Sequence, residues 1–322
     1  MTFATLQAAG RDIAYAQWGD PAGYPVIVLH GTPGSRLGRW SDDAALAATG
    51  MRQIGINRPG YGPSTRLANR TVSAVATDVL AVADALHVER FAIVGTSGGG
   101  PHALAVAALH PDRVSRCRVT SCLAPAGIPG FFDGMDPHNI HEWQLALAGH
   151  ALPEVTRRVD LMRQRVADDP ASIFSDLELP ASDRVALANQ AAFMVRRASL
   201  HEALATPFGW YDDDIAFTQP WGFQMAAITV PVEIRYGRHD VFVPPTHGDW
   251  LAAALTHADV TIWPEAGHLH DDAILDDYRA LVTACQNENH PPPVARPWVP
   301  TAPTSRQMSA REPHSHAGSE TL

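Results

Sequence analysis

The stretch that decides the fold is residues 91–104, which read FAIVGTSGGGPHAL. Its first five residues form a continuous apolar run and predict a buried strand, and the residues from Pro101 onward predict a helix with proline in its first turn. Between them, residues 95–99 match the pattern G-x-S-x-G, a sharp turn that holds the hydroxyl of Ser97 clear of the backbone. The pattern is short, so its weight comes from its position between a predicted strand and a predicted helix.

Outward from this turn, apolar segments of strand length alternate with segments of helical periodicity. The expected strands are 3–7, 12–18, 25–30, 51–57, 91–95, 115–122, 232–236 and 260–263, and the expected helices are 37–48, 72–86, 99–109, 246–255 and 272–286. This alternation is typical of crossover units on a mostly parallel sheet. The sequence therefore predicts an α/β fold.

The alternation stops after the sixth strand. Residues 128–217 are helical and loop-rich, with expected helices at 154–166 and 184–204 and no convincing strand. The chain is thus predicted to have a core in two parts, residues 1–127 and 218–286, interrupted by an all-helical cap, residues 128–217. Aromatic residues of the cap are expected to pack it against the core rather than to line a pocket; among them are Phe131, Phe132, Trp143 and Trp210.

The last 36 residues, 287–322, hold 7 of the 26 prolines and little apolar periodicity. They are predicted to be a disordered tail. The three cysteines, Cys117, Cys122 and Cys285, are few and widely spaced, and we expect buried free thiols.

The composition excludes several kinds of chemistry. The 322 residues include no lysine, and 24 arginines face 34 acidic residues for a net charge of -10. Schiff-base enzymes, pyridoxal-phosphate enzymes and lysine-containing P-loops are therefore excluded. An acidic chain without a basic run is a poor nucleic-acid binder. No apolar run approaches the roughly 20 residues of a membrane span, and the amino terminus resembles no export signal, so we expect a cytoplasmic protein.

A serine hydroxyl becomes a good nucleophile only when a base accepts its proton and a third group orients that base. Asp240 follows the predicted strand 232–236, and His268 follows the predicted strand 260–263. Both therefore lie at carboxyl ends of strands, where open α/β sheets place their sites. The order serine, aspartate, histidine along the chain is the one expected for this architecture. We predict a catalytic triad of Ser97, Asp240 and His268.

Acyl transfer also needs two backbone donors for the developing oxyanion. One is expected to be the N–H of Gly98, the residue after the nucleophile. The other is expected from the loop 30–35, which reads HGTPGS. Thr32 is the predicted donor there, because Pro33 has no N–H.

Six segments together carry a family resemblance: HGTPGS at 30–35, NRPGYGPS at 57–64, GTSGGGPHAL at 95–104, PWGF at 220–223, GRHDVFVP at 237–244 and AGH at 266–268. With them the chain resembles the α/β-hydrolase fold superfamily, in its group of serine esterases and proline iminopeptidase-like enzymes. The resemblance implies an eight-stranded, mostly parallel sheet flanked by helices, a helical cap over the active site, and no cofactor. One departure is Asn57, where many relatives carry aspartate.

The predicted function is that of a carboxylesterase-like serine hydrolase, which cleaves an ester, lactone or related acyl bond of a small molecule through an acyl-enzyme. An aminopeptidase or amidase similar to proline iminopeptidases is an alternative. The cap holds 14 acidic residues and 7 arginines, a net charge of -7. A cationic substrate would explain this surplus. The other explanation is a solvated helical surface, with Asp212-Asp213-Asp214 as a polar turn.

Three further hypotheses stay open or are disfavoured. A receptor of the same fold would keep the triad but turn over slowly, and a lyase or perhydrolase would use the same serine and histidine. Metal catalysis is disfavoured, because a metal site needs three or four converging ligands and His268 is already assigned to the triad. The sequence gives no indication of oligomeric state.

Overall fold

The computed structural model describes residues 1–39, 42–168, 174–269 and 274–289. Eight strands form one sheet: β1 (Thr2–Ala8), β2 (Arg11–Gly19), β3 (Tyr24–Leu29), β4 (Met51–Ile56), β5 (Phe91–Thr96), β6 (Val114–Thr120), β7 (Val232–Gly237) and β8 (Asp259–Trp263). Each of the eight predicted strands is confirmed, with ends within two residues of the expected ones.

The sheet has the order β1-β2-β4-β3-β5-β6-β7-β8. β1 pairs antiparallel with β2, and β2 antiparallel with β4, whereas all later pairings are parallel. The carboxyl ends of β3, β5, β6, β7 and β8 consequently meet at one edge. Gly95, at the end of β5, pairs with Leu29 at the end of β3, which places the serine turn beside the loop that follows β3.

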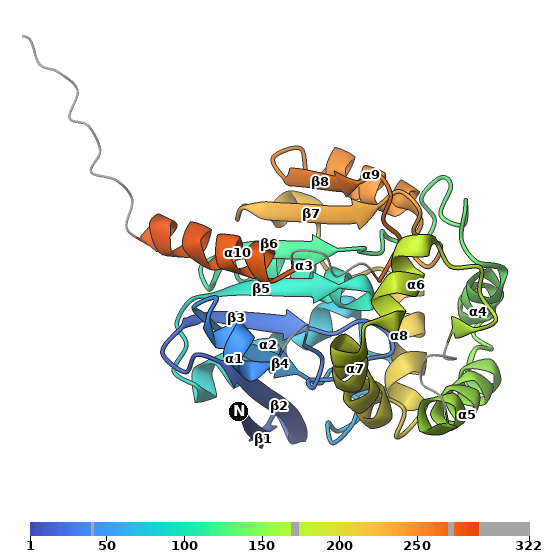
Figure 1. Cartoon of the computed structure of the whole chain (residues 1–322), viewed down its shortest axis with the longest axis horizontal. Coiled ribbons are helices and arrows are strands. Elements are labelled where there is room, and N and C mark those ends of the chain that lie inside the picture. The colour runs from blue at the N-terminus through green and yellow to red at the C-terminus, as the bar shows by residue number, and fades with distance from the viewer. Residues whose placement is uncertain (40–41, 169–173, 270–273, 290–322) are drawn as a thin grey trace, which may run out of the picture. The chain divides into compact units, whose positions relative to one another are not determined.

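Helices cover both faces of the sheet (Figure 1). The core helices are α1 (Asp43–Ala47), α2 (Val75–Ala85), α3 (Gly100–Leu109), α9 (Pro245–Ala254) and α10 (Ile274–Asn289). Buried side chains of α2, α3 and α9 pack with one face of the strands, and those of α1 and α10 pack with the other. Adjacent strand residues such as Val26 and Ile27 belong to opposite clusters, as the alternation of side chains in a strand requires.

Between β6 and β7 the chain forms the helices of the cap, which lie beyond the carboxyl ends of the strands (Figure 1). These are α4 (Pro137–Leu147), α5 (Leu152–Asp168), α6 (Ala181–Ala188), α7 (Gln190–Ala203) and α8 (Phe208–Thr218). No helix in the described part of the chain is long and apolar enough to cross a membrane.

Two helix predictions and one turn prediction differ from the structure. The helix expected at 37–48 is only the short α1. The one expected at 184–204 is two helices, because Asn189 is extended, with ψ of 106°, and separates α6 from α7. The segment of three consecutive aspartates is the buried helix α8 and not a polar turn, so that interpretation is wrong. Aspartate has low helix propensity, and tertiary contacts described below stabilise the helix instead.

The predicted boundary between the last helix and the tail also needs a correction. The last helix, α10, continues to Asn289, so residues 287–289 belong to it rather than to a tail. The remainder of the predicted tail, residues 290–322, lies outside the described residues. Cys117, Cys122 and Cys285 are buried free thiols, as predicted.

Candidate active site

Ser97 lies at the turn between β5 and α3 with a φ angle of +53°. This left-handed conformation is uncommon for a residue other than glycine and is strained. It is the backbone geometry that the G-x-S-x-G pattern predicts, and it directs the side chain away from both flanking elements. The fold therefore presents the hydroxyl at the carboxyl edge of the sheet.

Asp240 and His268 are joined by a hydrogen bond of 2.7 Å between Asp240 Oδ2 and His268 Nδ1. Asp240 follows β7 and is 2% exposed, and its other oxygen accepts the N–H groups of Phe242 and Val243 at 2.9 and 2.8 Å. These two backbone donors fix the orientation of the carboxylate that accepts from the imidazole. A hydrogen bond at Nδ1 leaves Nε2 as the basic nitrogen of a neutral ring.

The pKa of His268 reflects two opposing effects. Burial lowers it, but the charge of Asp240, the hydrogen bond to it and the charge of Asp183 together outweigh burial, so the pKa of His268 is raised above the ordinary value of a histidine. An imidazolium formed at this position is therefore stabilised, as a general base requires while it holds a proton.

Thr32 and Gly98, the predicted oxyanion donors, lie against each other. A Cβ atom added to Gly98 would overlap the side-chain oxygen of Thr32, so only glycine fits there. The loop that carries Thr32 is held by Arg58, whose guanidinium donates to the carbonyl oxygens of His30 and Gly31 and to Thr32 Oγ1. The structure thus brings the two predicted donor residues together beside the serine turn.

Arg58 is itself part of a buried charge cluster centred on Asp213 of α8. Both side chains are fully buried, and Arg58 Nη2 lies 2.5 Å from Asp213 Oδ2. Asp213 also accepts from Arg70 at 2.5 Å, from Tyr61 at 2.7 Å and from Thr32 Oγ1 at 2.6 Å. Burial alone would raise the pKa of the Asp213 carboxyl, but the two arginines hold it well below its usual range. One cap carboxylate therefore neutralises two buried cations next to loop 30–35, the candidate oxyanion loop.

A cavity of about 370 Å³ lies between the cap and the sheet edge. Four of the five predicted site residues line it, namely Ser97, His268, Thr32 and Gly98, while Asp240 lies behind His268. Ser97 and His268 both line this space, and the hydrogen bond that orients the histidine ring is the one to Asp240. The five residues are thus gathered at one place.

The cap supplies most of the remaining wall. Trp143 and Trp210 line the cavity, together with apolar residues such as Met162, Leu200 and Phe217. The expectation that the cap aromatics only pack against the core is therefore wrong for the two tryptophans. Phe131, in contrast, is 5% exposed and packs edge-on against Trp143, behind the cavity wall.

Sequence reasoning missed the carboxyl groups of this cavity, among them Asp214 and Glu142. Glu142 accepts from Trp210 Nε1 at 2.9 Å and pairs with Arg158. Asp214 is 6% exposed, and its Oδ2 has no hydrogen-bond partner among the described residues. Burial, followed by the charges of Glu142 and Asp213, raises the pKa of Asp214 well above the usual range of a carboxyl.

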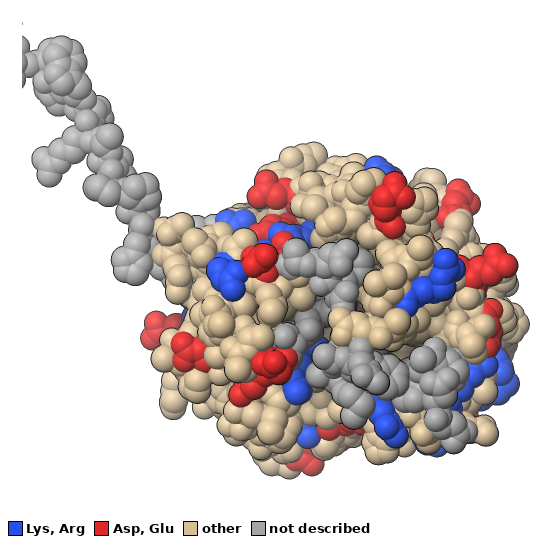
Figure 2. Space-filling view, in the orientation of Figure 1, with Lys and Arg blue, Asp and Glu red and all other residues tan. Residues whose placement is uncertain are grey.

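The three consecutive aspartates at 212–214 were the sequence feature that could have indicated these buried carboxyl groups. Successive helical residues point about 100° apart, so three adjacent aspartates of α8 face three surroundings. Asp212 pairs with Arg66 at 2.8 Å, Asp213 enters the buried cluster, and Asp214 faces the cavity. Two other cap acids, Glu142 and Asp183, are buried as well. Part of the acidic surplus is thus internal, and on the face shown in Figure 2 acidic and basic side chains are interspersed.

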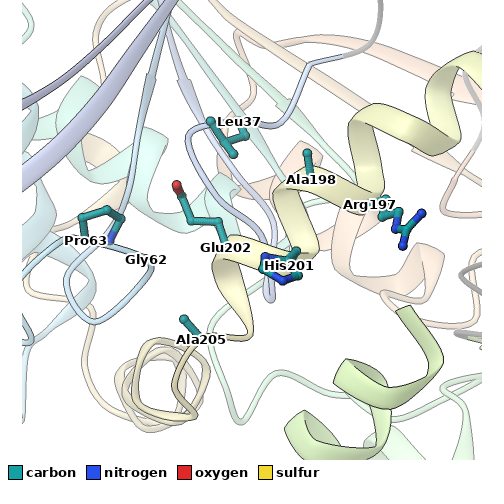
Figure 3. A pocket seen from close by; sticks show the side chains of 8 residues that line it. All are labelled: Leu37, Gly62, Pro63, Arg197, Ala198, His201, Glu202 and Ala205. Carbon is teal, nitrogen blue, oxygen red and sulfur yellow. The ribbon is translucent and has the colours of Figure 1, made fainter. Parts of the chain in front are cut away.

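A second hollow lies on the outer side of α7 (Figure 3) and shares no lining residue with the cavity of Ser97. Its residue Glu202 explains the unusual Asn57. The Asn57 amide donates to Glu202 Oε1 at 2.7 Å, and Arg36 pairs with the same carboxylate. An aspartate at position 57 would place a second negative charge against Glu202, so asparagine fits this cap better.

Comparison with known proteins identifies the family. The family model described as alpha/beta hydrolase fold matches residues 24–270. The chain belongs to the α/β-hydrolase fold family. This match covers β3 to the loop after β8 and includes every residue of the candidate site.

Individual relatives of this α/β hydrolase are distant. The chain is 28% identical to a 2-hydroxy-6-oxononadienedioate/2-hydroxy-6-oxononatrienedioate hydrolase of Cupriavidus pinatubonensis over 76% of this chain and 80% of that protein. It is 25% identical to a proline iminopeptidase of Xylella fastidiosa, over 79% and 86%. Among solved structures, the esterase RhEst1 from Rhodococcus sp. matches with a TM-score of 0.63 at 20% identity, over 88% of this chain and all of that one. At this sequence identity, the similarity to RhEst1 shows a shared fold only.

Proposed function

We propose that this protein is a serine hydrolase that cleaves a carboxylic ester, lactone or related acyl bond of a small molecule through an acyl-enzyme. One observation carries the proposal. Ser97, in a strained turn, lines a cavity with apolar and charged walls that is also lined by His268, whose Nδ1 is fixed by the buried Asp240. A candidate nucleophile, a candidate base and an acid that orients the base at one cavity support the proposal of acyl transfer.

In the proposed mechanism, Ser97 Oγ attacks the acyl carbon while His268 Nε2 takes its proton. The carbonyl oxygen becomes an oxyanion and accepts hydrogen bonds from the backbone N–H groups of Thr32 and Gly98. Collapse of this intermediate breaks the bond to the leaving group, which takes the proton from His268. Water then attacks the acyl-enzyme, gives its proton to His268, and releases the acid as the proton returns to Ser97.

The cavity favours acyl groups of modest size. A volume of about 370 Å³, with walls that combine tryptophan and aliphatic side chains with charged ones, is at the small end of ligand sites. A panel of acyl esters, lactones and aminoacyl arylamides assayed on pure protein tests the proposal. We expect multiple turnovers with esters or lactones that carry short or medium apolar acyl groups. A burst of about one equivalent followed by no turnover would contradict the hydrolase function and favour a receptor.

The raised pKa of His268 predicts a specific pH dependence. The neutral imidazole is the base, so activity is lost as pH falls and the ring is protonated. Because the charge of Asp240 raises the pKa of His268, the acidic limb of kcat/KM should have its midpoint above the ordinary histidine value of about 6.5. A pH profile of kcat/KM from about 4 to 9 measures this, and a midpoint clearly below that value would contradict the assignment.

A second candidate function is supported by Asp214. Asp214 lines the cavity beside Glu142, and its Oδ2 has no hydrogen-bond partner among the described residues; a substrate amine would pair with this carboxyl and replace the proton held by the raised pKa. The alternative is therefore an aminopeptidase or amidase, and the resemblance to proline iminopeptidases is in line with it.

Asp214→Asn tests this alternative, because it removes the charge at nearly constant volume. If the substrate is an amine, kcat/KM for aminoacyl arylamides should fall about 10²-fold or more, as for loss of one partner of a buried charge pair, while that for simple acyl esters changes less than about threefold. The matched control is Asp160→Asn, an exposed carboxylate of the same cap. Equal effects of Asp214→Asn on both substrate classes would refute amine recognition.

A further inference from the structure

The cap helix α6 contacts the loop of the candidate catalytic histidine directly. Asp183, in the first turn of α6, is fully buried. Its Oδ2 accepts the backbone N–H of His268 at 3.0 Å, and its Oδ1 accepts that of Leu269 at 3.0 Å. Ser182 Oγ accepts the N–H of Gly267 at 2.9 Å. Three consecutive N–H groups of the loop are thus bound by two adjacent side chains of the cap.

The loop is shaped for this contact. A Cβ atom on Gly267 would overlap Asp183 Oδ1 and the ring of Pro180, the residue before α6. Any other residue at position 267 would therefore push α6 away from the loop. Glycine at position 267 therefore allows α6 to pack closely against the loop, in addition to any role in the turn after β8.

We propose that Asp183 is a positioning residue for His268, fixing its backbone through two hydrogen bonds and stabilising its protonated ring through a buried negative charge. This inference rests on the proposed function, in which His268 is the general base. It assigns the cap a part in the catalytic machinery beyond shaping the cavity. Asp240 fixes the ring of His268 from the core, and Asp183 fixes its backbone from the cap.

The charges around His268 support a distinct contribution from Asp183. The pKa of His268 is lowered by burial and raised first by Asp240 and then by Asp183. Among the described residues, the other ionisable groups that line a small space with His268 are Arg118 and Arg235 from the sheet and Asp277 and Tyr278 from α10. The charged side chains of this space are paired, Arg118 with Glu233 and Arg235 with Asp277. Removal of the Asp183 charge should therefore lower the pKa of His268.

The test is the rate of labelling of Ser97 by a fluorophosphonate as a function of pH, in the full-length wild type and in Asp183→Asn. This probe needs no knowledge of the substrate, and it requires neutral His268. We expect the midpoint of the acidic limb to move down by at least about 0.5 pH unit and the plateau rate to fall about 10-fold to 10²-fold, since a displaced base reacts poorly. The exposed cap variant Asp160→Asn should match the wild type in both respects.

If Asp183→Asn folds and the midpoint of its acidic limb equals that of the wild type, the proposal is overturned, whatever the plateau rate of labelling. If Asp183→Asn does not fold, Ser182→Ala replaces it. That variant removes the bond to Gly267 without a change of charge and should lower the plateau at least about threefold with the limb in place. A wild-type plateau in Ser182→Ala would overturn the positioning role. Failure of the wild type to be labelled at all would instead refute the proposed function.

Discussion

Replacement of Ser97 by alanine should lower kcat by a factor of at least about 10⁴, since the nucleophile of a triad is indispensable to covalent catalysis. It should also abolish labelling by a fluorophosphonate. Alanine keeps the Cβ atom that the turn already accommodates at a φ of +53°. The free energy of unfolding should therefore change by no more than about 1 kcal/mol.

Steady-state kinetics with a chromogenic ester and gel-based labelling measure these effects. Ser73→Ala is the matched control, because Ser73 is a half-buried serine that does not line the cavity. Turnover or labelling that persists in Ser97→Ala but is lost in another serine variant would show that the nucleophile lies elsewhere.

The second large effect is expected at Asp213, and it concerns stability. Asp213→Asn leaves Arg58 and Arg70 without their shared carboxylate in a fully buried place. Breaking a buried ion pair by removing one partner costs about 3–5 kcal/mol. We therefore expect the free energy of unfolding in urea to fall by about that amount. The oxyanion loop should lose its support as well, so that fluorophosphonate labelling becomes slower in the fraction that stays folded.

The adjacent residue provides the control for this prediction. Asp212 is on the same helix and also pairs with an arginine, but the side chain of Arg66 is 35% exposed. Solvent can replace much of that interaction, so Asp212→Asn should cost about 1 kcal/mol or less. Equal losses in the two variants would contradict the view that the cluster around Asp213 ties the cap to the oxyanion loop.

The sequence predicts the inner strands of the sheet well because they are buried on both faces. Segments such as 25–30 and 91–95 are apolar throughout and bounded by turn residues, so their type and ends can be read locally. The candidate triad follows from the strand pattern, since Ser97, Asp240 and His268 each lie in the turn or loop after a predicted strand. The order serine, aspartate, histidine along the chain supports the same assignment.

The contacts between cap and core could not be predicted in this way. Asp213 meets Arg58 from 155 residues away, and Asp183 meets His268 from 85 residues away. No local pattern encodes such pairings. The helical state of α8 has the same origin, because its aspartates disfavour a helix locally and become stable there through arginines of distant loops. The break at Asn189 within a continuous helical pattern was missed for a similar reason.

The central claim is that Ser97 forms an acyl-enzyme, and mass spectrometry of an acid-quenched reaction tests it most directly. The protein has no lysine, so trypsin cleaves only at arginine, and residues 91–113 form one peptide with Ser97 as its single serine. After brief mixing with p-nitrophenyl acetate, we expect one acetyl group per chain, located on Ser97 in this peptide. An unmodified peptide 91–113, with the ester hydrolysed or the acetyl group on another residue, would contradict the account.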